Sequence, residues 1–447
     1  MNETAAVLRA SGASKPLKGV FRPPGDKSIS HRALILATLA DGASRIEGLL
    51  KAADIEATAS ACRALGADVE SRGASCRVNG VGMSGLREPQ GPLDMGNSGT
   101  AMRLLAGVLA AQPFDSVLVG DQSLMRRPMS RIAAPLREMG ASVNTAPDGC
   151  APLEIEGGHS LRGITWRSPV ASAQVKSCIL LAGLYAQGST RVIEPTASRD
   201  HTERMLRVFG AELPDTTTVR GGGRLSGANL SIPADISSAA FFLAAGALVP
   251  GSTIRLVGVG LNPGRAGIVD ALRKMGCDLR ISESNEHGGE PAGDLEVCWT
   301  GNLRGINLQA SEIPAIIDEL PILMVVAALA KGVTRIRGAE ELRFKESDRI
   351  AVMAAGLETL GIPVRQFPDG VDIDGCPELI MAGGETIELD AVGDHRCAMS
   401  FCVLAQGLGR EIRIRGAAEI GTSYPGFVSD LRAIGGSVHA EEEEANA

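Results

Sequence analysis

Aromatic side chains are scarce in this chain of 447 residues, since two Trp, two Tyr and nine Phe make up only 3% of it. The hydrophobic fraction is nevertheless 44%. The core must therefore be built mainly from the aliphatic residues Leu, Ile, Val, Met and Ala. A chain of this length exceeds one ordinary core and predicts two or three domains.

Long apolar runs are also lacking. A membrane-spanning helix needs roughly 18 or more apolar residues, and the longest runs, Ala239–Val249 and Ile322–Ala330, are shorter and suit buried helices. The first residues, MNETAAVLRA, do not combine a charged start with an apolar block. We therefore expect neither a membrane span nor a secretory signal.

Positive net charge is absent, because 44 Lys and Arg face 52 Asp and Glu, giving −8. A nucleic-acid surface needs a basic face, so this class of partner is disfavoured, although a local basic pocket for small anions is not. The nine cysteines show no CxxC or Cys/His metal spacing. They predict reduced, buried thiols in a cytoplasmic protein, with no disulfide framework.

A short pattern recurs six times: an apolar residue, Gly, a small or apolar residue, any residue, then Val or Leu. The copies follow one another at near-even spacing along the chain and contain Gly66, Gly140, Gly210, Gly276, Gly361 and Gly435. Each glycine follows a helical pattern and can adopt the left-handed conformation that ends a helix. A small-residue helix and a β-rich stretch precede each copy, so the repeated unit is helix, strand, helix, strand.

Units of about 70 residues fit poorly to an open solenoid, whose repeats usually have about 20 to 50 residues. We expect three units in each of two domains, with a ligand cleft between the domains. The chain should cross between them near Lys18–Phe21 and Pro233–Asp235.

Four segments of the first half bring cationic or small polar residues to the start of a helix. PPGDKSISHR places Lys27, Ser28 and Arg32 there, where free N–H groups bind anions. The alternative is a capped surface helix with solvated charges. MGNSGTAMR leads into a helix through backbone amides near Gly99 that suit a second anion. Again, a loop that merely starts a helix is the alternative.

The other two segments add an arginine clamp and neutral donors. In GDQSLMRRPMSR, either Arg126 or Arg127 suits a bidentate bond to carboxylate or phosphate, although solvated arginines are commoner. In PVASAQVKS, Ser172 and Gln174 offer hydrogen bonds, whereas Lys176 is expected to face solvent or another helix. RDHTE adds Arg199 and His201 at another helix entry.

The second half supplies carboxylates as well as cations. IIDELPIL places Asp318 and Glu319 in an apolar segment, where a carboxylate serves either as a proton acceptor or as a helix cap. FKESDR brings together Lys345, Glu346, Asp348 and Arg349, and DHRCAMS adds His395 and Arg396, with charged helix starts as the alternative.

The cations recur where each repeat enters its helix, so symmetry would gather them at one cleft. That cleft would hold several negative charges through Lys27, Arg32, Arg127, Arg199, Lys345, Arg349 and Arg396. GVGMSG (Gly80–Gly85) matches GxGxxG, but Pro89 interrupts any helix after it. A turn or hairpin is expected there rather than a dinucleotide site.

These motifs, PGDKSISHR, GNSGTAMR, RRPM, SAQVKS, RDHTE, IDELPIL, KESDR and DHRCAMSF, follow one another in the order found in the 5-enolpyruvylshikimate-3-phosphate synthase family. The chain resembles that family, and its bacterial class II branch in particular, over about Gly19–Phe427. The resemblance implies an α/β fold of two similar domains. Each would contain three βαβαββ-type units with buried helices, an inside-out α/β barrel. The implied domains are residues 21–235, inserted, and residues 1–20 plus 236–447.

The resemblance also implies the reaction and its residues. The enolpyruvyl group of phosphoenolpyruvate would pass to the 5-hydroxyl of shikimate 3-phosphate, on the route to chorismate and aromatic amino acids. Implied shikimate 3-phosphate ligands are Lys27, Ser28, Arg32, Ser172, Ala173, Gln174, Arg199, Asp318 and Lys345. Implied phosphoenolpyruvate ligands are Lys27, Gly99, Arg127, Arg349 and Arg396. Asp318 would accept the hydroxyl proton, and Glu346 and Lys27 would handle the methylene proton. Neither metal nor cofactor is implied, and a monomer is expected.

Three positions bear on this resemblance. Thr422 stands where many class I members have a phosphate-binding Lys. Gly99 stands where glyphosate-tolerant class II relatives have Ala, so we expect glyphosate to fit. Leu104 stands where class I has Pro, with no predicted effect.

Three other functions compete. An enolpyruvyl transferase for a nucleotide sugar is disfavoured by the KSISHR segment, and an RNA 3′-phosphate cyclase by the net charge of −8. A non-catalytic binding module is disfavoured by the intact Asp318, Glu346 and Lys27. The acidic run EEEEANA that closes the sequence is predicted to lack fixed structure, because like charges repel.

Overall fold

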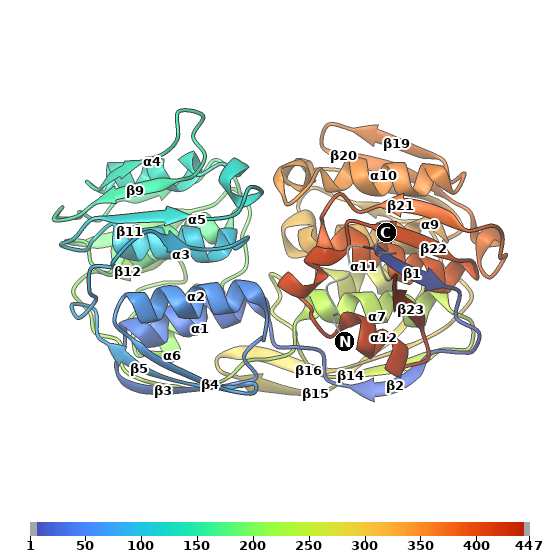
Figure 1. Cartoon of the computed structure of the whole chain (residues 1–447), viewed down its shortest axis with the longest axis horizontal. Coiled ribbons are helices and arrows are strands. Elements are labelled where there is room, and N and C mark those ends of the chain that lie inside the picture. The colour runs from blue at the N-terminus through green and yellow to red at the C-terminus, as the bar shows by residue number, and fades with distance from the viewer. Residues whose placement is uncertain (1–6, 442–447) are drawn as a thin grey trace, which may run out of the picture. The chain divides into compact units, whose positions relative to one another are not determined.

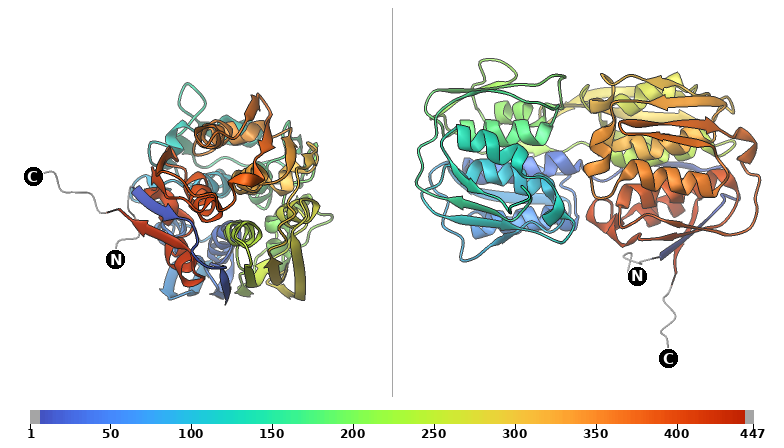
Figure 2. Two further views of the ribbon diagram at one scale, coloured as in Figure 1. Left: turned by 90° about the vertical axis from the view of Figure 1, so that its right-hand side faces the viewer. Right: turned by 90° about the horizontal axis from the view of Figure 1, so that it is seen from above.

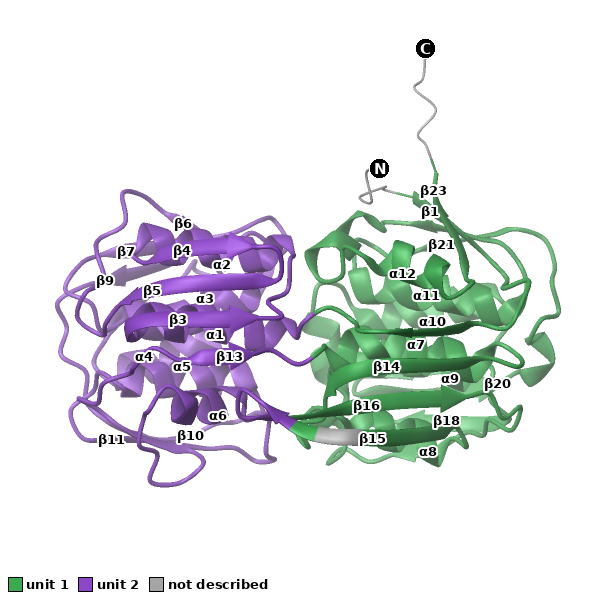
Figure 3. Ribbon diagram, turned by 90° about the horizontal axis from the view of Figure 1, so that it is seen from below, with its two compact units in different colours: residues 1–24, 234–285, 291–447 green, residues 25–233, 286–290 purple. Residues whose placement is uncertain are grey.

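The computed structural model describes residues 7–441, apart from the side chains of residues 283 and 284. These residues form two compact units, shown in separate colours in Figure 3. Unit 1 consists of Met1–Pro24, Ala234–Asn285 and Pro291–Ala447, and unit 2 of Gly25–Pro233 and Glu286–Glu290. Of the acidic C-terminal run, residues 442–447 lie outside the described part, whereas Glu441 forms ion pairs with Arg9 and Arg413.

Unit 2, which is described throughout, contains three sheets with two helices each (Figure 1). In the sheet β13-β3-β5-β4, the strands are β3 (Asp41–Glu47), β4 (Asp68–Arg72), β5 (Ser75–Val81) and β13 (Asn229–Ser231), with helices α1 (Lys27–Leu39) and α2 (Ala53–Ala64). In the sheet β6-β7-β9-β8, they are β6 (Leu93–Asp94), β7 (Ser116–Val119), β8 (Ser142–Asn144) and β9 (Leu153–Glu156), with α3 (Gly99–Leu109) and α4 (Ser130–Glu138). In the sheet β10-β11-β12, they are β10 (Thr165–Arg167), β11 (Ser189–Ile193) and β12 (Thr218–Arg220), with α5 (Ala173–Gly183) and α6 (His201–Val208).

The described part of unit 1 repeats this plan in three further sheets. In the sheet β15-β16-β14-β2, the strands are β2 (Lys18–Phe21), β14 (Thr253–Gly260), β15 (Asp278–His287) and β16 (Glu290–Cys298), with helices α7 (Ile236–Leu248) and α8 (Gly267–Lys274). In the sheet β17-β18-β20-β19, they are β17 (Asn307–Leu308), β18 (Gly332–Ile336), β19 (Val364–Phe367) and β20 (Gly370–Gly375), with α9 (Leu320–Ala328) and α10 (Arg349–Thr359). In the sheet β21-β22-β1-β23, they are β1 (Val7–Ser11), β21 (Ile387–Asp390), β22 (Ile412–Arg415) and β23 (Ser437–Ala440), with α11 (His395–Leu408) and α12 (Phe427–Ala433). The predicted α/β class with three repeated units in each half is confirmed. In five of the six repeats two strands follow the second helix, where the repeat pattern alone predicted one, and among the described residues α12 is followed by β23 alone.

The first helix of each of the six repeats lies in the interior. Every residue of α7 and of α9 is buried, and α7, α9 and α11 pack against one another. In unit 2, α3 packs against both α1 and α5. A helix that is apolar on all faces is stable only when other elements surround it. The two core clusters are accordingly aliphatic, which agrees with the low aromatic content.

The six glycines of the recurring pattern each end the second helix of one of the six repeats. All six have positive φ, between 77° at Gly361 and 104° at Gly66, Gly140 and Gly435. At the end of α2, the Gly66 N–H donates to the Arg63 carbonyl (3.0 Å) and the Ala67 N–H to the Cys62 carbonyl (3.1 Å), and the other five helix ends repeat this pair of bonds. This is the Schellman arrangement, in which glycine takes the left-handed position at no steric cost. The predicted helix ends are therefore confirmed.

Strands from distant parts of the chain complete three sheets, and one of these strands is β2, which pairs in parallel with β14. β13, near the end of unit 2's long segment, pairs in parallel with β3 near its start. The N-terminal strand β1 lies between β22 and β23, antiparallel to both, and Figure 2 shows these strands from opposite ends of the chain side by side. In the other direction, the β15–β16 hairpin belongs to unit 1 while its tip, Glu286–Glu290, belongs to unit 2.

Candidate active site

Lys27 opens α1 in unit 2. Asp26 caps this helix by accepting a hydrogen bond from the Ile29 N–H (2.8 Å), which leaves Lys27 and Ser28 in the first turn. The Lys27 ammonium forms an ion pair with the buried Asp54 carboxylate, in the first turn of α2. Sequence reasoning did not identify Asp54, which lies on the next helix of the chain.

Arg32 is buried one turn further along α1, with 3% of its surface exposed. Its guanidinium donates to the Thr202 hydroxyl (2.7 Å), the Ser177 hydroxyl (2.8 Å) and the Ser28 carbonyl (2.9 Å). Arg199 donates to the Ser28 hydroxyl (3.4 Å), which brings the two guanidinium groups to the same helix end. Burial and the neighbouring Arg199 lower the pKa of Arg32 to about 10, so it remains charged at neutral pH.

Gly99 and Arg127 lie together at the start of α3. Ser98 caps α3 by accepting from the Ala101 N–H (3.1 Å). A Cβ atom on Gly99 would lie 3.3 Å from Arg127 Nη1 and 3.0 Å from Arg103 Nη1, so the glycine leaves room for these groups. Arg127 is buried, whereas its neighbour Arg126 is exposed. Of the two arginines that the sequence left open, this favours Arg127.

Ser172, Ala173 and Gln174 form the start of α5. Ser172 is its N-cap, and the Ser172 N–H donates to Glu194 Oε1 (3.0 Å). The Gln174 amide accepts from Arg103 and donates to the Thr100 hydroxyl (2.8 Å), which links α5 to α3.

Lys176, one turn into α5, was predicted to face solvent or another helix, and it faces another helix, α6, through Glu203. Its side chain is 3% exposed and lies 3.1 Å from Glu194 Oε2 and 2.8 Å from Glu203 Oε1. Burial raises the pKa of the Glu203 carboxyl, and the Lys176 ammonium opposes that rise. The pair with Glu203 connects α5 to α6, and the pair with Glu194 connects α5 to the segment that follows β11.

His31 and His201 are further buried residues at these helix starts. His31 Nδ1 lies 2.7 Å from the Thr58 hydroxyl, and His31 Nε2 lies 3.2 Å from the Ser98 hydroxyl. His201 Nδ1 lies 2.7 Å from Glu290 Oε1. Burial, then Lys27 and Arg32, lower the pKa of His31 well below its ordinary value. His31 stands in the PGDKSISHR segment, but only its position, one residue before Arg32, hinted at a role.

In unit 1, Asp318 lies in a 3₁₀ turn, η3 (Ile317–Glu319), immediately before α9. Asp318 Oδ1 is 3.6 Å from Lys345 Nζ and 3.7 Å from Arg349 Nη1, and Arg396 donates to the Asp318 carbonyl (2.9 Å). Neither Asp318 nor Glu319 caps α9 through its side chain, so the alternative of a helix cap is wrong. Of the two roles that the sequence left open, this leaves Asp318 as a carboxylate that lies among three cationic residues.

Arg349 connects this carboxylate to two others. It is 1% exposed, donates through Nε to Asp394 Oδ2 (2.8 Å), and pairs with Glu346. Burial raises the pKa of the Asp394 carboxyl, but Arg349 and His395 more than offset this and hold the pKa below its ordinary value. Asp394 also caps α11, because it accepts from the Arg396 N–H (2.9 Å).

The predicted site residues thus form a connected group within each unit. Unit 2 holds Lys27, Ser28, Arg32, Gly99, Arg127, Ser172, Ala173, Gln174 and Arg199, and unit 1 holds Asp318, Lys345, Glu346, Arg349 and Arg396. That both groups line one cleft stays a prediction. Thr422 donates to the Glu419 carbonyl (2.7 Å) within its own turn, and Leu104 is buried in α3.

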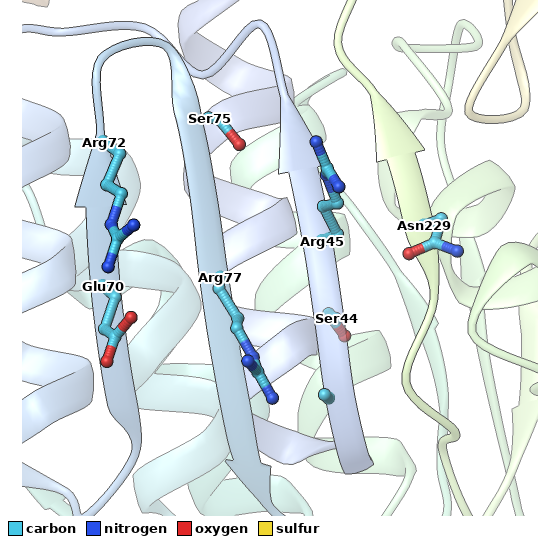
Figure 4. Close-up of a pocket in the computed structure, with 8 residues that line it drawn as sticks. Ser44, Arg45, Glu70, Arg72, Ser75, Arg77 and Asn229 are labelled. Carbon is cyan, nitrogen blue, oxygen red and sulfur yellow. The ribbon is translucent and has the colours of Figure 1, made fainter.

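Three other features of the described residues were considered as sites: metal-binding groups, membrane-spanning helices and a surface hollow. Among residues 7–441, no group of three or more His, Cys, Asp and Glu side chains is arranged to hold a metal ion, and no helix has the length and apolarity to span a membrane. A hollow of about 410 Å³ lies on the sheet β13-β3-β5-β4, and Figure 4 shows Arg45, Arg72 and Arg77 along its strands. None of the predicted site residues lines that hollow.

Comparison with known proteins gives one consistent family. Residues 12–431 match the model of EPSP synthase (3-phosphoshikimate 1-carboxyvinyltransferase). A 3-phosphoshikimate 1-carboxyvinyltransferase of Xanthomonas campestris pv. campestris (strain 8004) is 51% identical over 423 residues, covering 94% of this chain and 95% of that protein. The protein of that name from Methylococcus capsulatus is 49% identical over 433 residues, 96% of this chain and 98% of its own.

Solved structures agree. EPSP synthase from Acinetobacter baumannii has a TM-score of 0.87 and 44% identity, and the match covers 98% of this chain and 100% of that one. The enolpyruvyl transferase NikO from Streptomyces tendae, at 20% identity, shares the fold, with a TM-score of 0.77 and coverage of 97% and 98%.

Proposed function

Since the chain belongs to the EPSP synthase family, we propose that it transfers the enolpyruvyl group of phosphoenolpyruvate to the 5-hydroxyl of shikimate 3-phosphate, with release of phosphate. The observation that carries this proposal is Asp318, a carboxylate with Lys345 and Arg349 Nη1 3.6 and 3.7 Å from its Oδ1 atom. A reaction between an alcohol and a phosphorylated acid needs both a proton acceptor and fixed positive charge, and unit 1 supplies the two together.

Shikimate 3-phosphate is assigned to the helix starts of unit 2 and to two residues of unit 1. Arg32 and Arg199 meet at Ser28, and free N–H groups at the starts of α1 and α5 add to their charge, which suits the 3-phosphate. Ser172 and Gln174 suit the hydroxyl groups. The proposed ligands are Lys27, Ser28, Arg32, Ser172, Ala173, Gln174, Arg199, Asp318 and Lys345.

Phosphoenolpyruvate is assigned to Lys27, Gly99, Arg127, Arg349 and Arg396. Gly99 leaves its Cα side open beside Arg127 Nη1, so a small planar acid can approach the guanidinium. Arg349 and Arg396 carry fixed charge for a carboxylate or phosphate, since both are anchored by protein carboxyl or carbonyl oxygens. We propose that both sets of residues act on one pair of bound substrates.

The proton balance follows from these assignments. Asp318 accepts the 5-hydroxyl proton as the oxygen bonds to C2 of phosphoenolpyruvate, and Lys27 or Glu346 donates a proton to the methylene carbon. The tetrahedral adduct then expels phosphate and returns a proton from the methyl group. The arginines hold the two anions in place throughout, which lowers the entropic part of the barrier.

Phosphate release tests this function against the nucleotide-sugar alternative. Purified protein with phosphoenolpyruvate is given shikimate 3-phosphate in one series and a UDP-linked amino sugar in the other. We expect one phosphate per enolpyruvyl product with shikimate 3-phosphate and none above background with the sugar. Release with the sugar alone would reject the proposal.

Three finer points accompany the proposal. Glyphosate should compete with phosphoenolpyruvate because Gly99 lacks a side chain, and an inhibition constant in the millimolar range would reject this. All nine cysteines lie in the described residues and are free thiols, which supports a reducing, cytoplasmic location. A monomer is proposed, and sedimentation equilibrium would test it.

A further inference from the structure

Arg265 is a buried cation beside the proposed proton acceptor, and no predicted motif contains it. It follows β14 in the segment Asn262-Pro263-Gly264-Arg265, and its side chain is 4% exposed. The Asn262 carbonyl accepts from the Arg265 N–H (2.8 Å), and the Asn262 side chain accepts from the Gly264 N–H (2.9 Å). The loop thus fixes the backbone from which the guanidinium projects.

The Arg265 guanidinium meets oxygen atoms from two elements. Nη1 donates to Glu319 Oε1 (2.7 Å) and Oε2 (2.9 Å) and lies 3.7 Å from Asp318 Oδ2. Nη2 donates to the Ser237 hydroxyl and lies 3.8 Å from Asp235 Oδ1, at the start of α7. A side chain so buried and so engaged presents no face to a substrate.

Glu319, 1% exposed, extends the contact to a proposed phosphoenolpyruvate ligand. Its Oε1 lies 3.6 Å from Arg396 Nη1, the atom that donates to the Asp318 carbonyl. Asp318 is therefore approached through Oδ1 by Lys345 and Arg349, through Oδ2 by Arg265, and through its carbonyl by Arg396. The buried Arg265–Glu319 pair therefore contacts both the Asp318 carboxylate and the Arg396 guanidinium.

We propose that Arg265 is a positioning residue for the transfer reaction: paired with Glu319, it orients the Asp318 carboxylate and Arg396. This rests on the proposed function of Asp318. Lys345, Arg349 and Arg396 are assigned to substrate anions, so their charges are shared once substrates bind. Arg265 is assigned to none, and its charge stays with Asp318 and Glu319 throughout the reaction.

The pair has a signed effect on the proton acceptor. A nearby cation favours the ionised carboxylate, and a nearby anion disfavours it. Loss of Arg265 leaves the negative charge of Glu319 beside Asp318 without its cation. Asp318 should then require a higher pH to be ionised. Neutralising Glu319 instead leaves Arg265 acting on Asp318 alone, so the acceptor should work at a lower pH. Lys345, Arg349, Arg396 and Asp235 are unchanged in both cases.

The test compares four variants by the pH profile of kcat, with the Michaelis constants of both substrates and the urea midpoint measured alongside. R265Q should lower kcat about tenfold and move the acid limb up by about half a pH unit, with Michaelis constants within about threefold. E319Q should move the limb down, and R265K should recover most of the activity. R255Q, which breaks the pair between Arg255 on β14 and Asp294 on β16 (2.8 Å), is the matched control and should change only stability.

A purely structural role would lower the amount of folded enzyme without moving the acid limb. The proposal is overturned if folded R265Q keeps the wild-type profile, or if E319Q and R265Q shift it in the same direction. Should R265Q fail to fold, E319Q and R265K still decide, since an unshifted limb in E319Q contradicts the proposal. Wild-type protein that releases no phosphate from the two substrates would reject the proposed function instead.

Discussion

At the scale of single residues, His31 links two parts of unit 2's site. Its low pKa makes the ring neutral, so one nitrogen donates and the other accepts. The Thr58 hydroxyl donates to the Asp54 carbonyl (3.2 Å) and can accept from Nδ1–H, whereas Ser98 accepts from Ala101 and can donate to Nε2. These directions agree with one tautomer, so His31 connects the helix of Asp54 with the cap of α3.

Substituting His31 by Asn or Gln separates its two bonds. Asn places its amide near the Nδ1 position and keeps Thr58, and Gln reaches the Nε2 position and keeps Ser98. Each should cost about 1–3 kcal/mol of stability for the partner left without a bond. We expect H31N, but not H31Q, to raise the Michaelis constant for phosphoenolpyruvate several-fold, because Gly99 follows Ser98. Equal constants in the two variants would contradict this link.

Gly99 should tolerate no side chain without loss of phosphoenolpyruvate binding. In G99A, the new Cβ would lie 3.0 Å from Arg103 Nη1 and 3.3 Å from Arg127 Nη1, so the guanidinium groups must shift. We expect a rise of about tenfold in the Michaelis constant for phosphoenolpyruvate, since small misplacements of a clamp are costly. The constant for shikimate 3-phosphate should stay within about twofold. G91A, where no described atom lies within 4 Å of the new Cβ, serves as control.

Asp394 should make stability depend on acid pH. Its folded-state pKa lies below the unfolded value, so its stabilisation is complete above about pH 4 and is lost as pH falls through the folded pKa. D394N leaves Arg349 buried without this partner and should cost about 3 kcal/mol near pH 7. Urea unfolding should show the cost shrinking between pH 6 and about pH 3.

The control for this comparison is D278N, which removes an exposed pair with Arg280. It should cost less than about 1 kcal/mol at either pH. A cost in D394N that does not change with pH would contradict the account of Asp394.

At the scale of elements, the repeated helix end carries a local conformational requirement. Gly210 has φ of 85°, and no described atom lies within 4 Å of an added Cβ. G210A should therefore cost about 1–2 kcal/mol from backbone strain alone. G223A, equally open but without positive φ, should be nearly neutral in urea unfolding. An equal cost in both variants would show that strain is not the cause.

Helix ends were predictable because their signal is local. A helical run and its terminal glycine lie close together in the sequence, as at Leu65-Gly66, and the same geometry follows in six places. The partners of the strands were less predictable. Nothing near β1 indicates that it pairs with β22 and β23 from the other end of the chain, because this pairing depends on how the rest of the unit folds.

The candidate site divides in the same way. Cations at helix starts could be predicted from the segments that hold them, as for Lys27 and Arg349. Their partners Asp54 and Asp394 come from other elements and became evident only in three dimensions. The same holds for the partners of Lys176, because its two carboxylates belong to later segments of the chain, beyond α5.

At the scale of the whole molecule, the proposed reaction needs side chains from both units. The cations assigned to shikimate 3-phosphate lie mainly in unit 2, whereas the proton acceptor Asp318 lies in unit 1. The chain joins the units at Pro24–Gly25 and at Pro233–Ala234, and the hairpin tip Glu286–Glu290 is assigned to unit 2. Sequence patterns anticipated neither the hairpin tip nor the pairing of Glu290 with His201.

A crystal structure of the protein with shikimate 3-phosphate and a non-reactive phosphoenolpyruvate analogue tests this claim most directly. The account predicts that Lys27 and Arg32 of unit 2 and Lys345 and Arg396 of unit 1 all contact the same pair of ligands. Ligands held by the side chains of one unit alone would contradict it.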